Sequence, residues 1–236
     1  MLNPDSKSRE QMAGMFDNIA GTYDLLNHLL SLNIDKYWRN KAITFLDLKD
    51  SGKILDLATG TGDLAIAAMK LDPESITGID ISREMMAIGE TKVKKLNMSG
   101  KISFIYAPAE KIPFENEYFS AVISAFGIRN FSGLKMSLLE SFRVLKPGGV
   151  ICILEFSKPR FYLIRQLYFI YFRWILPFAG GLVSGNRKAY TYLPESVSSF
   201  PEGEEFISHL CEAGFRNCSF KTLSGGIATV YRGVKS

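Results

Sequence analysis

The chain has 236 residues, of which 22% are charged and 47% are apolar, and its formal net charge is +4. This length and balance fit one soluble domain with a substantial core, and they exclude a disordered or low-complexity protein. Its three cysteines, Cys152, Cys211 and Cys218, show neither metal-ligand nor disulfide spacing, so we expect a reduced, cytoplasmic protein with no metal.

The first fifty residues are predicted to be helical. Apolar residues recur at helical spacing at Met12, Met15, Phe16 and Ile19, and residues 34–48 form a second amphipathic pattern. We expect these helices to cover the rest of the domain.

The most informative stretch of the chain runs from residue 54 to residue 64 and reads ILDLATGTGDL. An apolar run ends in Asp56, a Gly60-Thr61-Gly62 turn follows, and helix-forming residues come next. A strand, a tight loop and a helix start in this order are typical of a nucleotide-binding loop. Glycine allows the backbone to approach a ligand closely.

Two cofactors fit this loop. Gly60, Gly62 and Ala65 formally satisfy the dinucleotide fingerprint. Asp56 favours S-adenosylmethionine over a dinucleotide, because a carboxylate repels a pyrophosphate but suits the sulfonium and ammonium groups of S-adenosylmethionine. Asp80 ends the next apolar strand, where a carboxylate can accept hydrogen bonds from the ribose hydroxyls of either cofactor. The remaining interpretation is a structural glycine turn beside two solvated acids.

Strands and helices then alternate, which indicates parallel βαβ units and a doubly wound α/β sheet. The predicted strands are Lys53–Ala58, Ser75–Asp80, Ile102–Tyr106, Phe119–Ala125 and Gly149–Phe156. The predicted helices between them are Gly62–Leu71, Arg83–Asn97 and Gly133–Leu145. A ligand is expected at the carboxyl ends of these strands.

The C-terminal part departs from this alternation. We predict a helix over Glu202–Ala213, ended by Gly214, and two strands over Phe215–Thr222 and Gly226–Gly233 that form a hairpin. An antiparallel hairpin closing a mostly parallel sheet of seven strands is the arrangement of S-adenosylmethionine-dependent methyltransferases, and is unusual for a dehydrogenase.

Residues 156–194 form an aromatic, basic segment without a single Asp or Glu. Its six lysines and arginines exceed the net charge of the whole chain, so the rest of the chain is net negative. Arg165, Arg173 and Pro177 interrupt the apolar run at 161–178, which argues against a membrane span. Two interpretations remain: a buried crossover helix, or a lid over a lipophilic substrate that touches the membrane surface.

Three further stretches carry a family resemblance. They are YDLLNHLLS at 23–31, which continues to Trp38; FGIRN at 126–130; and RVLKPGG at 143–149, which continues to a Glu-Phe-Ser at 155–157. Together with the loop and the hairpin, they make the chain resemble the ubiquinone/menaquinone biosynthesis C-methyltransferase family, of the demethylmenaquinone methyltransferase type. The resemblance covers nearly the full length.

The resemblance implies one class I methyltransferase domain over residues 1–236. Its parts are a helical cover (1–50), a cofactor-binding half (51–156), an aromatic basic lid (157–200) and a helix with a closing hairpin (201–236). The implied reaction is methyl transfer from S-adenosylmethionine to a ring carbon of a reduced prenylated quinone.

The cofactor is expected to contact a set of residues around the glycine loop. We expect the loop to wrap its methionine part, Asp80 to hold its ribose, and Pro108 and Ala109 to flank its adenine. The cofactor-binding candidates are Asp56, Gly60, Thr61, Gly62, Asp80, Pro108 and Ala109.

Catalytic candidates come from two of the family stretches. Arg129 can stabilise a phenolate or orient a water, Asn130 can orient the quinol oxygen, and Tyr23 and Asp24 lie where they can cover the site, with Asp24 a candidate base. A structural ion pair or helix cap is the competing explanation for each.

Three positions depart from the family pattern. The family usually has Met at the position of Leu26, His at that of Asp35, and Asp or Asn at that of Pro108. Proline offers the adenine amino group no side-chain acceptor, so either Glu110 compensates or one hydrogen bond, about 1 kcal/mol, is lost.

Other functions stay open at this point. The ring can be a naphthoquinol or a benzoquinol, or the acceptor can be another phenol, a lipid or an RNA. RNA is disfavoured, because the chain lacks an Asn-Pro-Pro-Tyr stretch and a Pro-Cys pair. A scaffold without turnover and a homo-oligomer also remain as hypotheses.

Overall fold

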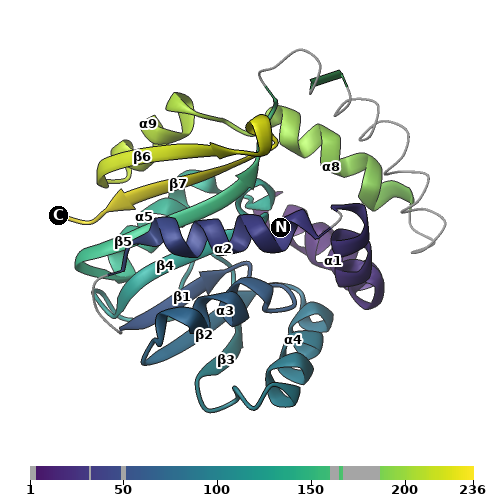
Figure 1. Cartoon of the computed structure of the whole chain (residues 1–236), viewed down its shortest axis with the longest axis horizontal. Helices are drawn as coiled ribbons and strands as arrows, with labels where there is room; N and C mark the ends of the chain where they lie inside the picture. The colour runs from purple at the N-terminus through teal and green to yellow at the C-terminus, as the bar shows by residue number, and fades with distance from the viewer. Residues whose placement is uncertain (1–3, 32, 49–51, 160–164, 167–186) are drawn as a thin grey trace.

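A computed structural model describes residues 4–31, 33–48, 52–159, 165–166 and 187–236. Its centre is one sheet of seven strands in the order β3-β2-β1-β4-β5-β7-β6 (Figure 1). The strands are β1 (Lys53–Leu57), β2 (Ser75–Asp80), β3 (Ile102–Tyr106), β4 (Phe119–Ala125), β5 (Leu145–Phe156), β6 (Arg216–Leu223) and β7 (Ala228–Val234). Strand β7 runs antiparallel to both of its neighbours, and the other pairings are parallel. The predicted α/β fold with a C-terminal hairpin is confirmed.

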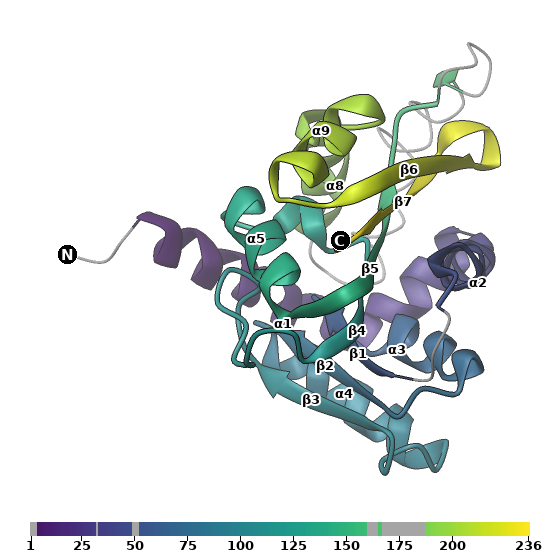
Figure 2. The ribbon, with the colours of Figure 1, turned by 90° about the vertical axis from the view of Figure 1, so that its left-hand side faces the viewer.

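Helices cover both faces of the sheet (Figures 1 and 2). The described helices are α1 (Pro4–Leu30), α2 (Ile34–Leu46), α3 (Asp63–Ala68), α4 (Arg83–Lys95), α5 (Leu134–Val144), α8 (Arg187–Ser199) and α9 (Glu204–Glu212). Helices α2, α3 and α4 pack with one face of the sheet around Ile54 and Ile76. Helices α5 and α9 pack with the other face around Leu55 and Phe119. The sheet is therefore buried on both sides, as the apolar runs of its central strands require.

Two element boundaries differ from their predicted positions by three residues or more. Strand β5 begins at Leu145, which pairs with Phe119, and the pairing then shifts so that Val150 lies opposite Ala121. The Lys-Pro-Gly-Gly turn lies inside this irregularity, because proline lacks an N–H and Gly148 has φ +78°. The helix after the glycine loop ends at Ala68 and continues as a 3₁₀ turn over Met69–Leu71.

The N-terminal helices pack against other elements of the domain. Helix α1 packs mainly against α4, and α2 packs against β5. Most of the aromatic segment lies outside the described residues, so neither interpretation of residues 161–178 is tested. Within the described part of the chain, no helix is both long and apolar enough to cross a membrane.

Candidate active site

The glycine loop turns sharply because several of its residues have left-handed backbone angles. Strand β1 ends at Leu57, and φ is +51° at Ala58, +55° at Gly60 and +79° at Gly62. A Cβ on Gly60 would meet no atom within 4 Å, whereas one on Gly62 would lie 3.0 Å from the Phe104 ring. Gly60 therefore opens towards free space and Gly62 towards the protein interior.

A first cavity, which we call the donor cavity, lies at the carboxyl ends of β1, β2 and β4. Gly60, Asp80, Ala109 and Phe126 are among its lining residues, and Phe16 and Tyr23 of α1 close it. Its empty volume is about 680 Å³ when the space at its open mouth is included.

Asp80 holds the loop against β2. Its Oδ2 accepts the amide N–H of Gly60 at 2.8 Å, and its Oδ1 accepts that of Ser82 at 2.8 Å. Burial raises the pKa of this carboxyl, and these two backbone hydrogen bonds oppose the rise. A carboxylate has about four acceptor sites, so Asp80 can still accept from a ligand hydroxyl. The donor cavity thus fits the ribose of a nucleoside cofactor.

Apolar residues line the donor cavity beyond Asp80. They include Ile81, Met85, Ala107 and Ala109, whereas Pro108 between the two alanines is not among the lining residues. Glu110 does line the cavity, and its Oε1 accepts from Ser132 Oγ at 2.6 Å and from the Gly133 amide at 3.0 Å. An aromatic base therefore fits between these apolar walls, and the Glu110 carboxylate lies in the same lining.

A second cavity, the acceptor cavity, adjoins the donor cavity and shares Phe16, Tyr23 and Phe126 with it. Helices α1, α2 and α8 supply much of its wall, including Trp38 and Tyr192. Phe126 has φ +59°, which is unusual for a bulky residue and is found where strain serves a site. The shared residues mark the place where a donor group and an acceptor can meet.

Arg129 lines the acceptor cavity as a member of a buried ion pair. Its Nη1 lies 2.7 Å from Glu155 Oε1, and the side chains are 7% and 0% exposed. Nη1 also donates to the Phe126 carbonyl. Asn130 lines the donor cavity and accepts a hydrogen bond from the Tyr192 hydroxyl at 3.1 Å. Tyr23 thus lines both cavities, whereas Arg129 lines the acceptor cavity and Asn130 the donor cavity.

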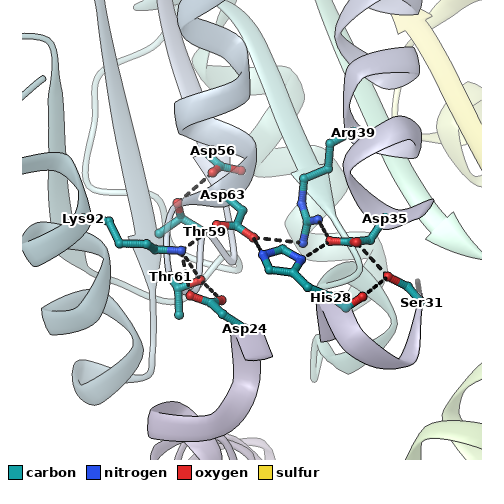
Figure 3. Close-up of polar contacts among 10 residues, drawn as sticks. All are labelled: Asp24, His28, Ser31, Asp35, Arg39, Asp56, Thr59, Thr61, Asp63 and Lys92. Atoms are coloured by element: carbon teal, nitrogen blue, oxygen red, sulfur yellow. Dashed lines mark hydrogen bonds and ion pairs between the residues drawn. The ribbon is translucent and has the colours of Figure 1, made fainter. Parts of the chain in front are cut away.

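Asp24 and Thr61 face away from both cavities and towards each other. Thr61 Oγ1 donates to Asp24 Oδ1 at 2.6 Å, and Lys92 Nζ donates to Asp24 Oδ2 at 2.8 Å (Figure 3). Neither Asp24 nor Thr61 is among the described lining residues of the cavities. Their contacts indicate that they anchor α1 to the glycine loop.

Asp35 is a cavity residue that sequence reasoning missed. It is the one carboxylate among the described residues that line the acceptor cavity. Burial acts to raise its pKa, but a hydrogen bond from Ser31 and the Arg39 guanidinium hold the pKa below its usual value. His28 Nδ1 lies 2.8 Å from its Oδ2. The only sequence signal was the departure from the family pattern at this position.

His28, Asp35 and Asp63 bring their ligand atoms within 4.8 Å of one another, which is a geometry that can hold a cation. Arg39 contacts both carboxylates and Lys92 lies 2.5 Å from Asp63 Oδ1 (Figure 3). Since these two side chains already balance the acids, we assign no metal to the cluster.

Asp56 lies buried beneath the glycine loop. Thr59 Oγ1 donates to its Oδ2 at 2.7 Å, and its Oδ1 has no hydrogen-bond partner among the described residues. Burial, assisted by the nearby Asp80 carboxylate and opposed by the Thr59 hydrogen bond, raises its pKa to about 7. Asp56 does not line the donor cavity itself.

Asp56→Asn is expected to flatten the pH dependence of stability. The folded pKa of about 7 lies above the unfolded value of about 4, so the folded state binds the proton more tightly and stability falls as pH rises between these values. Melting temperatures from pH 4.5 to 7.5 should therefore decline less in this variant than in the exposed control Asp72→Asn. Equal slopes in both variants would show that Asp56 is already ionised at low pH.

Known proteins resemble this chain over nearly its full length. The model of the ubiE/COQ5 methyltransferase family matches residues 4–235. The ubiquinone/menaquinone biosynthesis C-methyltransferase UbiE of Geotalea daltonii is 47% identical over 228 residues, covering 96% of this chain and 97% of the relative. The demethylmenaquinone methyltransferase of Bacteroides fragilis is 45% identical over 232 residues, covering 98% and 95%.

Solved structures share the fold at low sequence identity. The SpnF cyclase superposes with a TM-score of 0.68 at 17% identity, covering 96% of each chain. A SAM-dependent methyltransferase of Thermotoga maritima, a possible histamine N-methyltransferase, gives 0.65 at 18% identity, covering 95% of this chain and all of that one. The fold is thus that of the class I methyltransferases, and the chain belongs to the ubiE/COQ5 methyltransferase family.

Proposed function

We propose that this enzyme methylates a ring carbon of a reduced prenylated quinone, with demethylmenaquinol as its acceptor and S-adenosylmethionine as its methyl donor. The observation that carries the proposal is the pair of adjoining cavities that share Phe16, Tyr23 and Phe126. One cavity suits a nucleoside and the other is largely aromatic and apolar. Membership in the family and the names of the two relatives support this assignment.

The donor cavity supplies a partner for each part of the cofactor. We assign the ribose hydroxyls to Asp80, the methionine part to Gly60 with Thr61 and Gly62 shaping the loop, and adenine to the wall at Ala109. Glu110 lines this wall and uses only Oε1 in its described hydrogen bonds, so Oε2 can accept from the adenine amino group. This arrangement compensates for Pro108. Asp56 supports the loop from beneath through its hydrogen bond with Thr59.

The acceptor cavity prepares the quinol. Bound S-adenosylmethionine supplies a methyl group that is already activated for displacement. A quinol hydroxyl must lose its proton so that electron density reaches the neighbouring ring carbon. Asp35 is ionised and faces the cavity, so we assign proton acceptance to it, directly or through a water. The guanidinium groups of Arg129 and Arg39 stabilise the developing phenolate.

Tyr23 and Asn130 orient the ring at the junction of the cavities. Burial raises the pKa of Tyr23, so its hydroxyl stays protonated and can donate to the quinol oxygen. Positioning of this kind accounts for a large part of the acceleration in a displacement reaction. Asp24, whose two oxygens accept from Thr61 and Lys92, holds the neighbouring Tyr23 in place.

The choice between naphthoquinol and benzoquinol is tested with the purified enzyme. We expect kcat/KM for a reduced demethylmenaquinone to exceed that for a 2-methoxy-6-polyprenyl-benzoquinol with the same tail. Both substrates are reduced with dithionite, and the methylated products are separated by mass. A higher kcat/KM for the benzoquinol would contradict this choice and assign the enzyme to ubiquinone biosynthesis.

We also propose that the enzyme touches the membrane surface, where its lipophilic acceptor resides. Large apolar side chains are exposed near the acceptor cavity: Leu25 is 61% exposed, Ile34 41% and Tyr37 50%. Exposed Lys36 and Lys41 flank Tyr37 on α2. Apolar groups beside lysines suit the interface of an anionic bilayer.

Reversing two of these charges is expected to weaken binding to anionic liposomes by about tenfold or more, since each lysine contributes about 1 kcal/mol near such a surface. Sedimentation of Lys36→Glu/Lys41→Glu is compared with that of Lys94→Glu/Lys95→Glu, which makes the same charge change on exposed residues of α4. Equal sedimentation of the two variants would contradict a contact through α2.

A further inference from the structure

A network of charged side chains beside the acceptor cavity joins four helices to the glycine loop (Figure 3). Its members are Asp24 and His28 of α1, Asp35 and Arg39 of α2, Thr61 of the loop, Asp63 of α3 and Lys92 of α4. The charged side chains are between 6% and 25% exposed. The network therefore lies largely away from bulk water.

Lys92 is the centre of one half of the network. Its Nζ donates to Asp63 Oδ1 at 2.5 Å, to Asp24 Oδ2 at 2.8 Å and to Thr61 Oγ1 at 3.0 Å. An ammonium group has three N–H donors, so these contacts use all of them. Thr61 in turn donates to Asp24. Lys92 thus ties α1, the glycine loop and the start of α3 together.

Asp63 connects this half to the acceptor cavity. Its Oδ2 lies 3.6 Å from Arg39 Nη2 and 3.6 Å from His28 Nε2. Both of these side chains contact Asp35, which lines the cavity together with Arg39. The path from Lys92 to the acceptor cavity therefore passes through Asp63 and one further side chain.

The network holds four helices and the glycine loop in one arrangement, whatever it adds to net stability. Partly buried ion networks contribute little net stability, because removing charges from water offsets their attraction. Lys92 itself is not among the described lining residues of either cavity. Without it, the carboxylates of Asp24 and Asp63 would lie near one another with no cation between them, and they would repel.

We infer that Lys92 is a positioning residue for methyl transfer, which holds Tyr23 at the junction of the cavities through Asp24 and holds Arg39 and Asp35 in the acceptor cavity through Asp63. This inference rests on quinol methylation but not on which ring is methylated. It predicts an effect on the transfer step from a residue that contacts neither reactant.

The test compares Lys92→Met with Lys95→Met, which removes an exposed lysine from the same helix. For Lys92→Met we expect kcat to fall by about tenfold or more, because small misplacements of reacting groups cost this much. The dissociation constant of S-adenosylmethionine, measured by calorimetry, should change by less than about threefold. Lys95→Met should match the wild type, and Lys92→Arg should recover most of the rate because a guanidinium can still donate to both acids.

Hydrogen exchange gives a second readout that does not depend on turnover. Amides of α1 around Tyr23 should exchange faster in Lys92→Met than in Lys95→Met, whereas strand β4 should stay equally protected in both. The double variant Asp24→Asn/Lys92→Met should be no slower than Lys92→Met alone, because Lys92→Met already removes the contact between Lys92 and Asp24.

Three results would overturn the positioning role. The first is a kcat of Lys92→Met within about twofold of that of Lys95→Met. The second is a Lys92→Met variant in which only the affinity for S-adenosylmethionine falls. The third is hydrogen exchange of the α1 amides that is the same in both variants. A wild-type chain that methylates no quinol is a different result, because it contradicts the proposed function while the exchange measurement still decides the role of Lys92.

Discussion

Asp80→Asn is expected to weaken S-adenosylmethionine binding by about 100-fold. The Asp80 carboxylate accepts the Gly60 and Ser82 amides on separate oxygens, each at 2.8 Å. An asparagine has only one acceptor oxygen, so one amide loses its partner and the ribose loses a charged acceptor. Hydrogen bonds to a charged group contribute about 1.5–3 kcal/mol each, and about 1.4 kcal/mol corresponds to a tenfold change in affinity. Calorimetric titration measures the change directly.

The control is Glu90→Gln, which makes the equivalent substitution at an exposed position of α4. It should bind the cofactor like the wild type. If Asp80→Asn kept an affinity within about threefold of this control, the ribose would lie elsewhere and the donor cavity would be misassigned. The melting temperature of the variant without ligand is also measured. An unchanged melting temperature indicates a lost ligand contact, whereas a lower one indicates a displaced loop.

Arg129→Met is expected to destabilise the fold by about 3–5 kcal/mol, because it leaves the Glu155 carboxylate buried without its cation. Glu155 is 0% exposed, and its Oε1 lies 2.7 Å from Arg129 Nη1. Urea unfolding gives the change in the free energy of unfolding. A loss of turnover in this single variant therefore does not identify a role of Arg129 in the reaction.

The double variant Arg129→Met/Glu155→Gln separates the two roles. Removing both charges should recover most of the stability, since the buried carboxylate no longer needs a partner. Turnover should remain at least about tenfold below the wild type, because the acceptor cavity lacks the guanidinium that stabilises the phenolate. A double variant with wild-type kcat would show that Arg129 serves only as the structural partner of Glu155.

Local sequence patterns were sufficient to predict the sheet and to bring Gly60 and Asp80 together at its edge. The loop between Asp56 and Gly62 and the carboxylate at Asp80 follow from apolar runs that end in polar residues, and parallel strands bring such ends together. The structure confirms that Gly60 and Asp80 meet through a hydrogen bond. The start of β5 at Leu145 was not predicted, because a helix pattern runs directly into the Lys-Pro-Gly-Gly turn.

The acceptor cavity could not be predicted in the same way. Its residues Asp35 and Arg39 come from α2, and the network behind them depends on Lys92 of α4, which only tertiary packing brings to Asp63 and Asp24. On its own helix, a lysine such as Lys92 looks like one of several solvated cations near the C-terminal end. Sequence spacing likewise gave no sign that Thr61 donates to Asp24 rather than facing the cofactor.

The central claim is that the two cavities bring a methyl donor to the ring of a reduced prenylated quinone. It is tested most directly by incubating the purified enzyme with methyl-labelled S-adenosylmethionine and demethylmenaquinone, with and without reduction of the quinone. We expect the label to appear on a ring carbon of the quinone only in the reduced sample, as located by mass fragmentation. Label on an oxygen, label in the oxidised sample at the same rate, or no label in either sample would contradict it.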